Sequence, residues 1–150
     1  MKILITGGAG FIGKSLSNYL LKNDFEVSIL DNLSPQVHGN NATFDNSDVN
    51  FIKGDICDFE LIKNLIGKRD FDVIYHLASE TGTAQSMYEI ERYVRVNELG
   101  TANLLQSVAE SKNNKKTRLI LSSSRSIYGE GSYVDEDGIK VTPPARSIKN

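Results

Sequence analysis

The sequence predicts one α/β domain built on a doubly wound parallel sheet, and three observations lead to this prediction. Short apolar runs of strand length alternate along the chain with longer segments of helical periodicity. The apolar runs are nearly continuous, which is typical of parallel strands that helices cover on both faces. The chain has 150 residues, enough for a hydrophobic core, so we expect residues 1–150 to form a single domain.

The first half of the chain contains three predicted strands and two predicted helices. Residues 2–6 form a β-rich run that ends in glycines, and a helix is expected over 11–22. Its apolar residues at helical spacing are Phe11, Ile12, Leu16, Tyr19 and Leu20. A second strand is expected at 26–30, closed by Asp31, and a third at 49–53, with a polar loop over 34–48 between them. Residues 59–66 predict a helix with Asp58 as its N-cap.

The second half contains two further strands, expected at 72–77 and 118–122. Between them, residues 86–111 show a long helical pattern that is interrupted near Gly100. Its apolar stripe consists of Ile90, Val94, Leu104, Leu105 and Val108. Because crossovers between parallel strands are right-handed, these elements predict a doubly wound sheet. After Ser122 the pattern weakens, and residues 142–150 are expected to be loop.

The composition excludes several classes of protein. Hydrophobic residues make up 39% of the chain and charged residues 24%, an ordinary globular balance. The net charge is −2, and no basic stripe is present, so no nucleic-acid partner is expected. No segment approaches the roughly 20 apolar residues of a membrane span, and the first apolar run is too short for a signal peptide. We therefore expect a cytoplasmic protein without a membrane partner.

The chain has one cysteine, Cys57, and two histidines, His38 and His76. No internal disulfide can form, which fits a reducing compartment, and a lone cysteine beside apolar residues is expected to be inert. These residues do not have the spacing of ordinary metal ligands, so no metal site is expected. At the end of a strand, His76 favours a packed and hydrogen-bonded role over a catalytic one.

A glycine-rich turn follows the first predicted strand and precedes the first predicted helix. It reads as GxGxxG from Gly8 or as GxxGxxG from Gly7. Gly7 permits the tight exit from the strand, Gly10 permits close approach of the backbone to a pyrophosphate, and Gly13 permits close packing of the helix. The first amides of that helix then point at the phosphates. The turn predicts a dinucleotide site of Rossmann type; the alternative is a glycine turn that binds no ligand.

Asp31 ends the second strand, at the spacing from the glycine turn that is expected of the carboxylate binding the adenosine ribose. A carboxylate there would repel a 2′-phosphate, and no Arg or Lys follows nearby to accept one. NAD is therefore predicted over NADP. The alternative is an aspartate that merely caps a turn.

These motifs resemble the extended branch of the short-chain dehydrogenase/reductase family, and the resemblance continues through most of the chain. Gly54-Asp55-Ile56, the segment 76–79, Val96-Asn97 and the segment 122–129 are similar to the family's motifs after strands three and four, on the following helix and at the active-site serine. The resemblance implies a set of cofactor-binding residues: Gly7, Gly10, Phe11, Ile12, Gly13, Asp31, Asn32, Asp55, Ile56, Leu77, Ala78, Ser79 and Asn97.

Within this branch, the chain resembles nucleotide-sugar epimerases and dehydratases. The segments 80–90 and 123–131 are similar to the subgroup that acts on dTDP-linked deoxysugars, such as the dTDP-L-rhamnose 4-epimerases. The resemblance implies a dTDP- or UDP-linked hexose as substrate. It also implies epimerisation at C4 through a 4-keto sugar, with NAD accepting and returning the hydride. Ser124 stands where the family has its catalytic serine, whereas Ser122 and Ser123 are expected to satisfy backbone groups.

The chain departs from the family at the general base. The family uses a Tyr-x-x-x-Lys motif well after the serine, and no tyrosine of this sequence is followed by lysine at that spacing. We therefore expect the chain to be the N-terminal part of a longer enzyme, without the substrate domain and inactive alone. The resemblance also implies a homodimer of the full-length enzyme.

Two other functions remain open. A nucleotide-sugar 4,6-dehydratase would carry acidic residues directly after the serine, where this chain has Arg125 and Ser126. A non-catalytic NAD-binding module would agree with the missing tyrosine and lysine, but the serine strand and the segment 80–90 argue against it.

Overall fold

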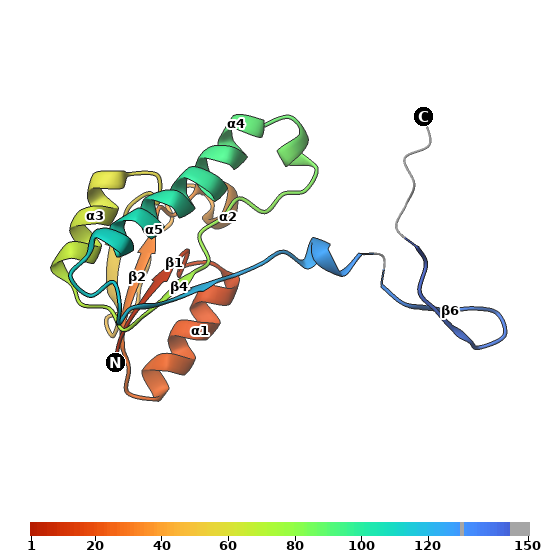
Figure 1. Ribbon diagram of the computed structural model, residues 1–150, viewed down its shortest axis with the longest axis horizontal. Coiled ribbons are helices and arrows are strands. Elements are labelled where there is room, and N and C mark those ends of the chain that lie inside the picture. The colour runs from red at the N-terminus through yellow and green to blue at the C-terminus, as the bar shows by residue number, and fades with distance from the viewer. Residues whose placement is uncertain (130, 145–150) are drawn as a thin grey trace.

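The computed structural model describes residues 1–129 and 131–144. Five parallel strands form one sheet in the order β3-β2-β1-β4-β5, with β1 at its centre (Figure 1). The strands are β1 (Lys2–Thr6), β2 (Glu26–Asp31), β3 (Asn50–Lys53), β4 (Val73–His76) and β5 (Arg118–Leu121). The predicted doubly wound parallel sheet is therefore confirmed, with strand bounds within one residue of those expected.

Helices cover both faces of the sheet. Helix α1 (Phe11–Lys22) lies on one face, and α3 (Phe59–Lys68) and α5 (Gly100–Glu110) pack together on the other (Figure 1). The alternation of side chains along β1 divides the core accordingly, because Ile3 and Ile5 belong to one buried cluster and Leu4 to the other. All three side chains are buried, as expected of a strand in the middle of a two-faced sheet.

The helix α3 starts where the sequence predicts. The Asp58 carboxylate accepts a hydrogen bond from the amide of Leu61 at 3.0 Å, so Asp58 is the N-cap. The helix continues to Lys68, two residues beyond the expected end. In addition, the short helix α2 (Pro35–His38) lies inside the segment that was expected to be loop.

The buried stripe of α1 differs from the expected one. Phe11, Ile12 and Tyr19 are exposed, and the buried residues are Gly13, Ser17 and Leu20. The prediction is confirmed for Leu20, which is buried, and for Leu16, which packs against the core, but it was wrong for the other three residues, because the helix turns Gly13 and Ser17 to the sheet in their place. Small side chains allow the close approach that Gly13 requires: a Cβ there would lie 2.5 Å from the Cα of Gly8.

The long helical pattern before β5 is also arranged differently from the prediction. A 3₁₀ turn, η1 (Gln85–Met87), precedes α4 (Ile90–Tyr93), which continues through a π-helical segment, η2 (Val94–Leu99), into α5. Gly100 does not interrupt the helix. It packs on Ile56, whose Cγ2 would lie 2.7 Å from a Cβ at this position. The stripe was predicted only in part, since Leu104 is buried but Ile90, Val94 and Leu105 are exposed.

Beyond β5, residues 122–129 and 131–144 lead away from the sheet (Figure 1). They include the 3₁₀ turn η3 (Arg125–Tyr128) and two short antiparallel strands that the sequence did not predict, β6 (Tyr133–Val134) and β7 (Lys140–Val141). Residues 142–144 have no regular structure, as expected, and residues 145–150 of the predicted loop lie outside the described residues.

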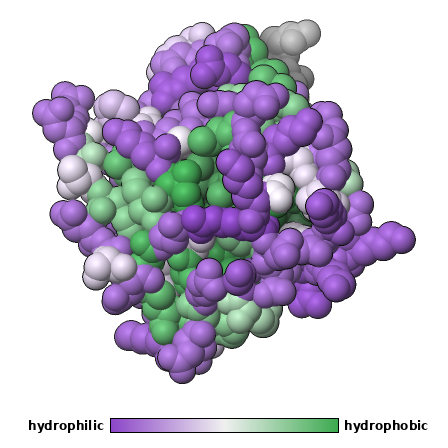
Figure 2. Space-filling view, turned by 90° about the vertical axis from the view of Figure 1, so that its left-hand side faces the viewer, coloured by the Kyte–Doolittle hydropathy of each residue, from purple (hydrophilic) through white to green (hydrophobic). Residues whose placement is uncertain are grey.

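The surface is mixed in character. Seen from the side that carries α3, hydrophilic side chains dominate, with hydrophobic surface exposed between them (Figure 2). Within the described ranges, no helix is both long and apolar enough to cross a membrane.

Candidate functional site

The candidate site lies at the carboxyl edge of the sheet, where the chain leaves each strand. Strands β2 and β3 lie on one side of β1, and β4 and β5 lie on the other. The strand order therefore reverses next to β1, and ligands of doubly wound sheets bind at such a reversal, beyond the carboxyl ends of the strands. The glycine turn follows β1 at this point.

Gly7 makes the tight exit from β1 that the motif predicts. Its φ of +69° lies in the left-handed region, and its amide donates to the carbonyl of Leu30 at 2.8 Å. A Cβ at Gly7 would lie 2.7 Å from the amide nitrogen of Ala78. The turn therefore touches both neighbours of β1, and only glycine fits between them. The sequence did not predict the role of Gly8, where a Cβ would lie 2.7 Å from the side chain of Ile29.

The start of α1 fits the phosphates of a dinucleotide. Gly10 is the N-cap, no side chain of the described residues caps the helix there, and the first turn holds no acidic residue. The first amides of the helix are thus available to an anion. A Cβ at Gly10 would meet only the carbonyl oxygen of Gly7, at 3.3 Å, and its φ of −72° suits any residue. Packing within the described residues therefore does not require this glycine, whereas close approach of a ligand would.

Asp31 is buried against the glycine turn. Its Oδ2 accepts from the amide of Ala9 at 3.0 Å, and its Oδ1 accepts from the amide of Leu33 at 2.8 Å. His38 Nε2 lies 3.5 Å from the same Oδ1, a contact that no sequence pattern indicated. Both the predicted role and the turn-capping alternative fit this geometry, because each carboxylate oxygen can accept more than one hydrogen bond.

Asp55 lies after β3 and is linked to the loop after β2. The Asn32 amide donates to Asp55 Oδ2 at 3.5 Å, and the Cys57 amide donates to Asp55 Oδ1 at 2.8 Å. Burial alone would raise the pKa of Asp55, but these hydrogen bonds and the charge of Arg95 lower it below its ordinary value. The carboxylate is therefore ionised and preorganised as an acceptor.

Cys57 lies partly buried beside Asp55, and its inertness stays a prediction. Burial, together with the nearby charge of Asp55, raises the pKa of its thiol. Its neighbour Ile56 is buried in the core, so only the backbone of Ile56 could contact a cofactor.

His76 has the packed role that the sequence favoured. Its Nδ1 lies 2.6 Å from Thr6 Oγ1, and its Nε2 lies 2.9 Å from Thr101 Oγ1. Because the Thr101 hydroxyl donates to the carbonyl of Asn97, it accepts from Nε2–H, and Nδ1 accepts from Thr6. The ring is thus neutral, and burial lowers its pKa.

Asn97 holds the loop after β4. Its Oδ1 accepts from the amide of Glu80 at 2.8 Å, and its Nδ2 donates to the carbonyl of Glu80 at 3.1 Å. This loop begins with Leu77 and Ala78, whose amides donate to the carbonyl and the hydroxyl of Thr6. The three residues 77–79 therefore lie beside the glycine turn.

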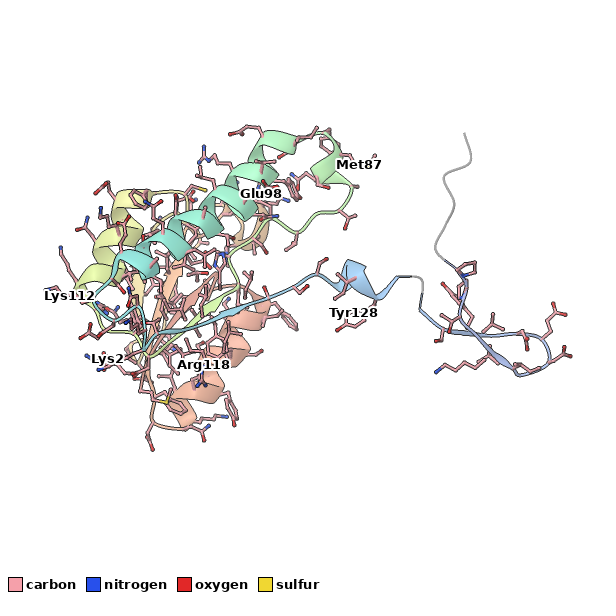
Figure 3. The ribbon with its side chains drawn as sticks, viewed as in Figure 1. Lys2, Met87, Glu98, Lys112, Arg118 and Tyr128 are labelled. Carbon is pink, nitrogen blue, oxygen red and sulfur yellow. The ribbon has the colours of Figure 1, made fainter. Side chains whose placement is uncertain are left out.

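The predicted catalytic serine belongs to the segment after β5. Ser124 is exposed and comes three residues after the end of β5. The chain then passes through η3, which contains Tyr128, and leads away from the sheet (Figures 1 and 3). Before Ser124, Ser122 donates to the carbonyl of His76 at 3.3 Å, the strand-end role that was expected. The structure thus brings together the predicted groups after β1 to β4, whereas Ser124 stands on a separate segment.

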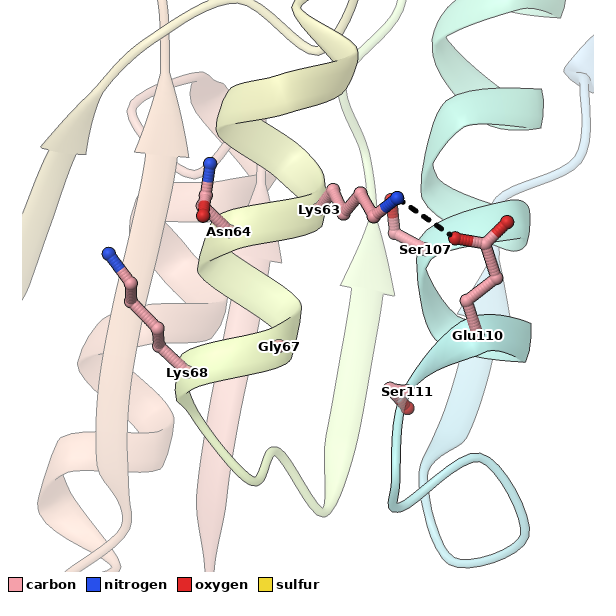
Figure 4. A pocket seen from close by; sticks show the side chains of 7 residues that line it. All are labelled: Lys63, Asn64, Gly67, Lys68, Ser107, Glu110 and Ser111. Atoms are coloured by element: carbon pink, nitrogen blue, oxygen red, sulfur yellow. Dashed lines mark ion pairs between the residues drawn. The ribbon is translucent and has the colours of Figure 1, made fainter.

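A separate groove of about 360 Å³ lies between the last turns of α3 and α5 (Figure 4). Lys63 and Glu110 form an ion pair across it, with Nζ and Oε2 3.4 Å apart. Ser107 Oγ is buried there, without a hydrogen-bond partner among the described residues. Because these helices run antiparallel to the strands, the groove lies at the opposite edge of the sheet from the glycine turn.

The described residues contain no cluster of three or more His, Cys, Asp or Glu residues that could hold a metal ion. The fold is of Rossmann type, and its carboxyl-edge groups are of the kind with which such folds bind dinucleotides. Comparison with known proteins specifies this class further.

The family model described as GDP-mannose 4,6 dehydratase matches residues 4–144. Over 147 residues, the chain is 36% identical to dTDP-L-rhamnose 4-epimerase of Burkholderia thailandensis, covering 97% of this chain and 40% of the relative. Over 140 residues, it is 38% identical to dTDP-D-glucose 4,6-dehydratase of Dictyostelium discoideum, covering 91% and 32%. The chain therefore belongs to the nucleotide-sugar epimerase and dehydratase family of extended short-chain dehydrogenases, as its motifs predicted.

Solved structures of epimerases are similar to this chain as well. UDP-glucose 4-epimerase of Thermus thermophilus, in complex with NAD, is similar with a TM-score of 0.74 and 30% identity, covering 92% of this chain and 43% of that chain. The chain thus spans less than half the length of these relatives.

Proposed function

We propose that this chain forms the NAD-binding part of an enzyme that epimerises a nucleotide-linked hexose at C4. The observation that carries the cofactor assignment is the contact between the glycine turn and Asp31, through the amide of Ala9 at 3.0 Å. This contact fixes a buried carboxylate beside the uncapped start of α1, so one ligand can bind to both with its ribose and its pyrophosphate. Similar solved epimerases were obtained in complex with NAD.

Each group then has a defined role. The turn glycines and the first amides of α1 would hold the pyrophosphate, Asp31 the adenosine ribose, and Asp55 the adenine amino group. Residues 77–79 would line the pyrophosphate and ribose, and Asn97 would keep that segment in place through Glu80. When bound, the nicotinamide supplies the hydride chemistry. The Ser124 hydroxyl would hydrogen-bond the C4 hydroxyl of the sugar.

A 4,6-dehydratase is the second candidate, because a dehydratase of Dictyostelium discoideum is as similar to this chain as the epimerase. Elimination of water needs acid and base carboxylates beside the serine, and this chain has Arg125-Ser126 directly after Ser124. This difference favours epimerisation. The reading frame beyond codon 150 tests both enzymes against a non-catalytic module, since an enzyme requires a Tyr-x-x-x-Lys motif downstream.

The cofactor assignment is tested by calorimetric titration of the chain with NAD and NADP. The wild-type chain is expected to prefer NAD, because the Asp31 carboxylate repels a 2′-phosphate. Asp31→Asn keeps an acceptor for the turn amides but removes the charge, so the preference should fall at least about tenfold, an energy of about 1.4 kcal/mol. Equal affinity of the wild-type chain for NAD and NADP would contradict the role of Asp31.

Asp58→Asn is a matched control, because Asp58 is also a strand-to-helix aspartate that accepts a backbone amide, but on the loop that leads into α3. Its cofactor preference should equal that of the wild-type chain. A change as large as that of Asp31→Asn would mean that the effect comes from net charge and not from position.

A further inference from the structure

The side-chain amide of Gln85 uses all four of its hydrogen-bonding positions. Its Oε1 accepts from Gln36 Nε2 at 2.6 Å and from the Tyr93 hydroxyl at 3.1 Å. Its Nε2 donates to Gln36 Oε1 at 3.2 Å and to Glu89 Oε1 at 2.8 Å. Tyr93 and Glu89 follow Gln85 closely in the sequence, and their bonds orient its side-chain amide. The amide therefore presents Nε2 as a donor and Oε1 as an acceptor to Gln36.

The two glutamines belong to loops on opposite sides of the glycine turn. Gln36 lies in α2, which follows β2, and Gln85 lies in η1, which follows β4. Strands β2 and β4 are the two neighbours of β1, so their ends are roughly 10 Å apart with the end of β1 between them. The paired amides therefore connect the two loops across the carboxyl end of β1.

The segment that carries Gln85 is itself firmly held. Arg92 Nη2 lies 2.9 Å from Glu80 Oε1, and Arg92 Nη1 lies 2.9 Å from Glu89 Oε2. The Tyr93 hydroxyl has a single proton, which is shared between the carbonyl of Gly82 at 2.8 Å and Gln85 Oε1 at 3.1 Å. The loop after β4 is thus attached to the helix behind it, and among the described residues its hydrogen-bonded connection to α2 is made through Gln36.

We propose that Gln36 and Gln85 form a clasp that gates the entry and exit of the dinucleotide. The inference rests on the proposed function, in which the adenosine binds beside Asp31 after β2 and the cofactor continues past the glycine turn towards β4. A ligand in that position lies between the loops that the clasp joins. Both glutamines are positioning residues, because they act on the loops and not on the reacting atoms.

A clasp has a kinetic signature that a merely structural pair would not have. The clasp joins the two loops on either side of the proposed ligand, so it must open both for binding and for release. Removing it should raise the association and dissociation rate constants by a similar factor and leave the dissociation constant within about twofold. Two partly exposed neutral hydrogen bonds correspond to an increase of about three- to tenfold in each rate.

The test is stopped-flow fluorescence with NADH, in which association is followed over a range of NADH concentrations and dissociation by displacement with excess NAD. Gln36→Ala, Gln85→Ala and the double variant are each expected to show the faster rates. The double variant should be no faster than Gln85→Ala, because the two residues share the same bonds. Gln106→Ala is the matched control, since it removes a glutamine bond to Glu110 on α5, and its rates should equal those of the wild-type chain.

Wild-type rates in Gln36→Ala would overturn the clasp, as would a weaker dissociation constant with an unchanged association rate. A second measurement needs no cofactor. In Gln36→Ala, amide hydrogen exchange of residues 80–88 should be about three- to tenfold faster, although the substitution lies across β1. Unchanged exchange there would also overturn the clasp. A wild-type chain that binds no NADH would contradict the proposed function, and the exchange result would then decide on the clasp by itself.

Discussion

Two glycines of the same turn are required for different reasons. Gly7 has a positive φ, and a Cβ there would overlap the backbone of Ala78. Gly10 has an ordinary φ, and a Cβ there would meet only one carbonyl oxygen. The first glycine is a requirement of folding, and the second would be explained by the proposed ligand.

Alanine substitutions should separate these requirements. Gly7→Ala is expected to lower the free energy of unfolding by about 2–4 kcal/mol, from left-handed strain and overlap with the β4 loop. Gly10→Ala is expected to change it by less than about 1 kcal/mol, yet to weaken NAD binding at least about tenfold. Urea denaturation and calorimetry measure both quantities. Strong NAD binding by Gly10→Ala would contradict the proposed position of the pyrophosphate.

His76 makes the stability of the chain depend on pH. Burial lowers its pKa below the ordinary value of 6.5, and both ring nitrogens are committed to Thr6 and Thr101 as a neutral ring. Below pH 6.5 the unfolded chain therefore binds a proton that the folded chain does not. Stability from this residue is complete above that pH and decreases as the pH falls towards the lower folded-state pKa, by up to about 1.4 kcal/mol per pH unit.

Urea denaturation between pH 8 and pH 5.5 measures this dependence. His76→Gln should reduce the slope of stability against pH below 6.5, whatever its effect on stability at pH 8. The surface variant Lys22→Gln controls for the effect of replacing any one side chain. Its slope of stability against pH should equal that of the wild-type chain. A slope in His76→Gln equal to that of the wild-type chain would exclude His76 as its origin.

At the scale of elements, the helix before β5 keeps the loop after β4 in position through hydrogen bonds. Its π-helical segment η2 contains Asn97, whose amide bonds both backbone groups of Glu80. Turns of π-helix widen the helix and are frequent at functional sites. Gly100 follows and allows the same helix to approach Ile56. One helix therefore contacts the core and the carboxyl edge together.

Asn97→Asp tests this role, because aspartate can accept from the Glu80 amide but cannot donate to the Glu80 carbonyl. The free energy of unfolding should fall by about 1–3 kcal/mol, and hydrogen exchange should increase in residues 78–82. Asn64→Asp is the control, since Asn64 donates to a backbone carbonyl on the exposed side of α3, and it should change stability by less than about 0.5 kcal/mol. Equal losses in both variants would argue against a special role of Asn97.

Local patterns explain which elements the sequence could predict. The glycine turn, Asp31 and the Asp58 cap are short-range signals, and each was found where it was expected. The buried face of α1 was predicted only in part, because Gly13 and Ser17 carry no hydrophobic signal. The pair of Gln36 and Gln85 was missed because contacts between residues 49 positions apart leave no local pattern.

At the scale of the whole molecule, the carboxyl ends of five strands form one edge of the sheet, although they are spread from Thr6 to Leu121 along the chain. The parallel topology and the family could be predicted, because the periodicity and the motifs run through the entire sequence. The position of Ser124 relative to the glycine turn could not be predicted, since no pattern after Ser122 specifies how that segment packs. Leu121 and Tyr128, which lie on either side of Ser124 in the sequence, are both exposed, so few described residues pack on this segment.

The central place of β1 has a consequence for biosynthesis. The strand is translated before the other strands of the sheet, yet Thr6 meets His76, its hydrogen-bond partner, only 70 residues later, and Gly7 likewise meets Ala78. Until β4 emerges from the ribosome, the glycine turn has a neighbour on one side only. Parallel sheets whose pairings lie far apart in sequence form slowly, because a long loop must close before any contact compensates its lost entropy. The glycine turn therefore becomes competent for its proposed ligand only after β4 has been translated, about 70 residues after the turn itself.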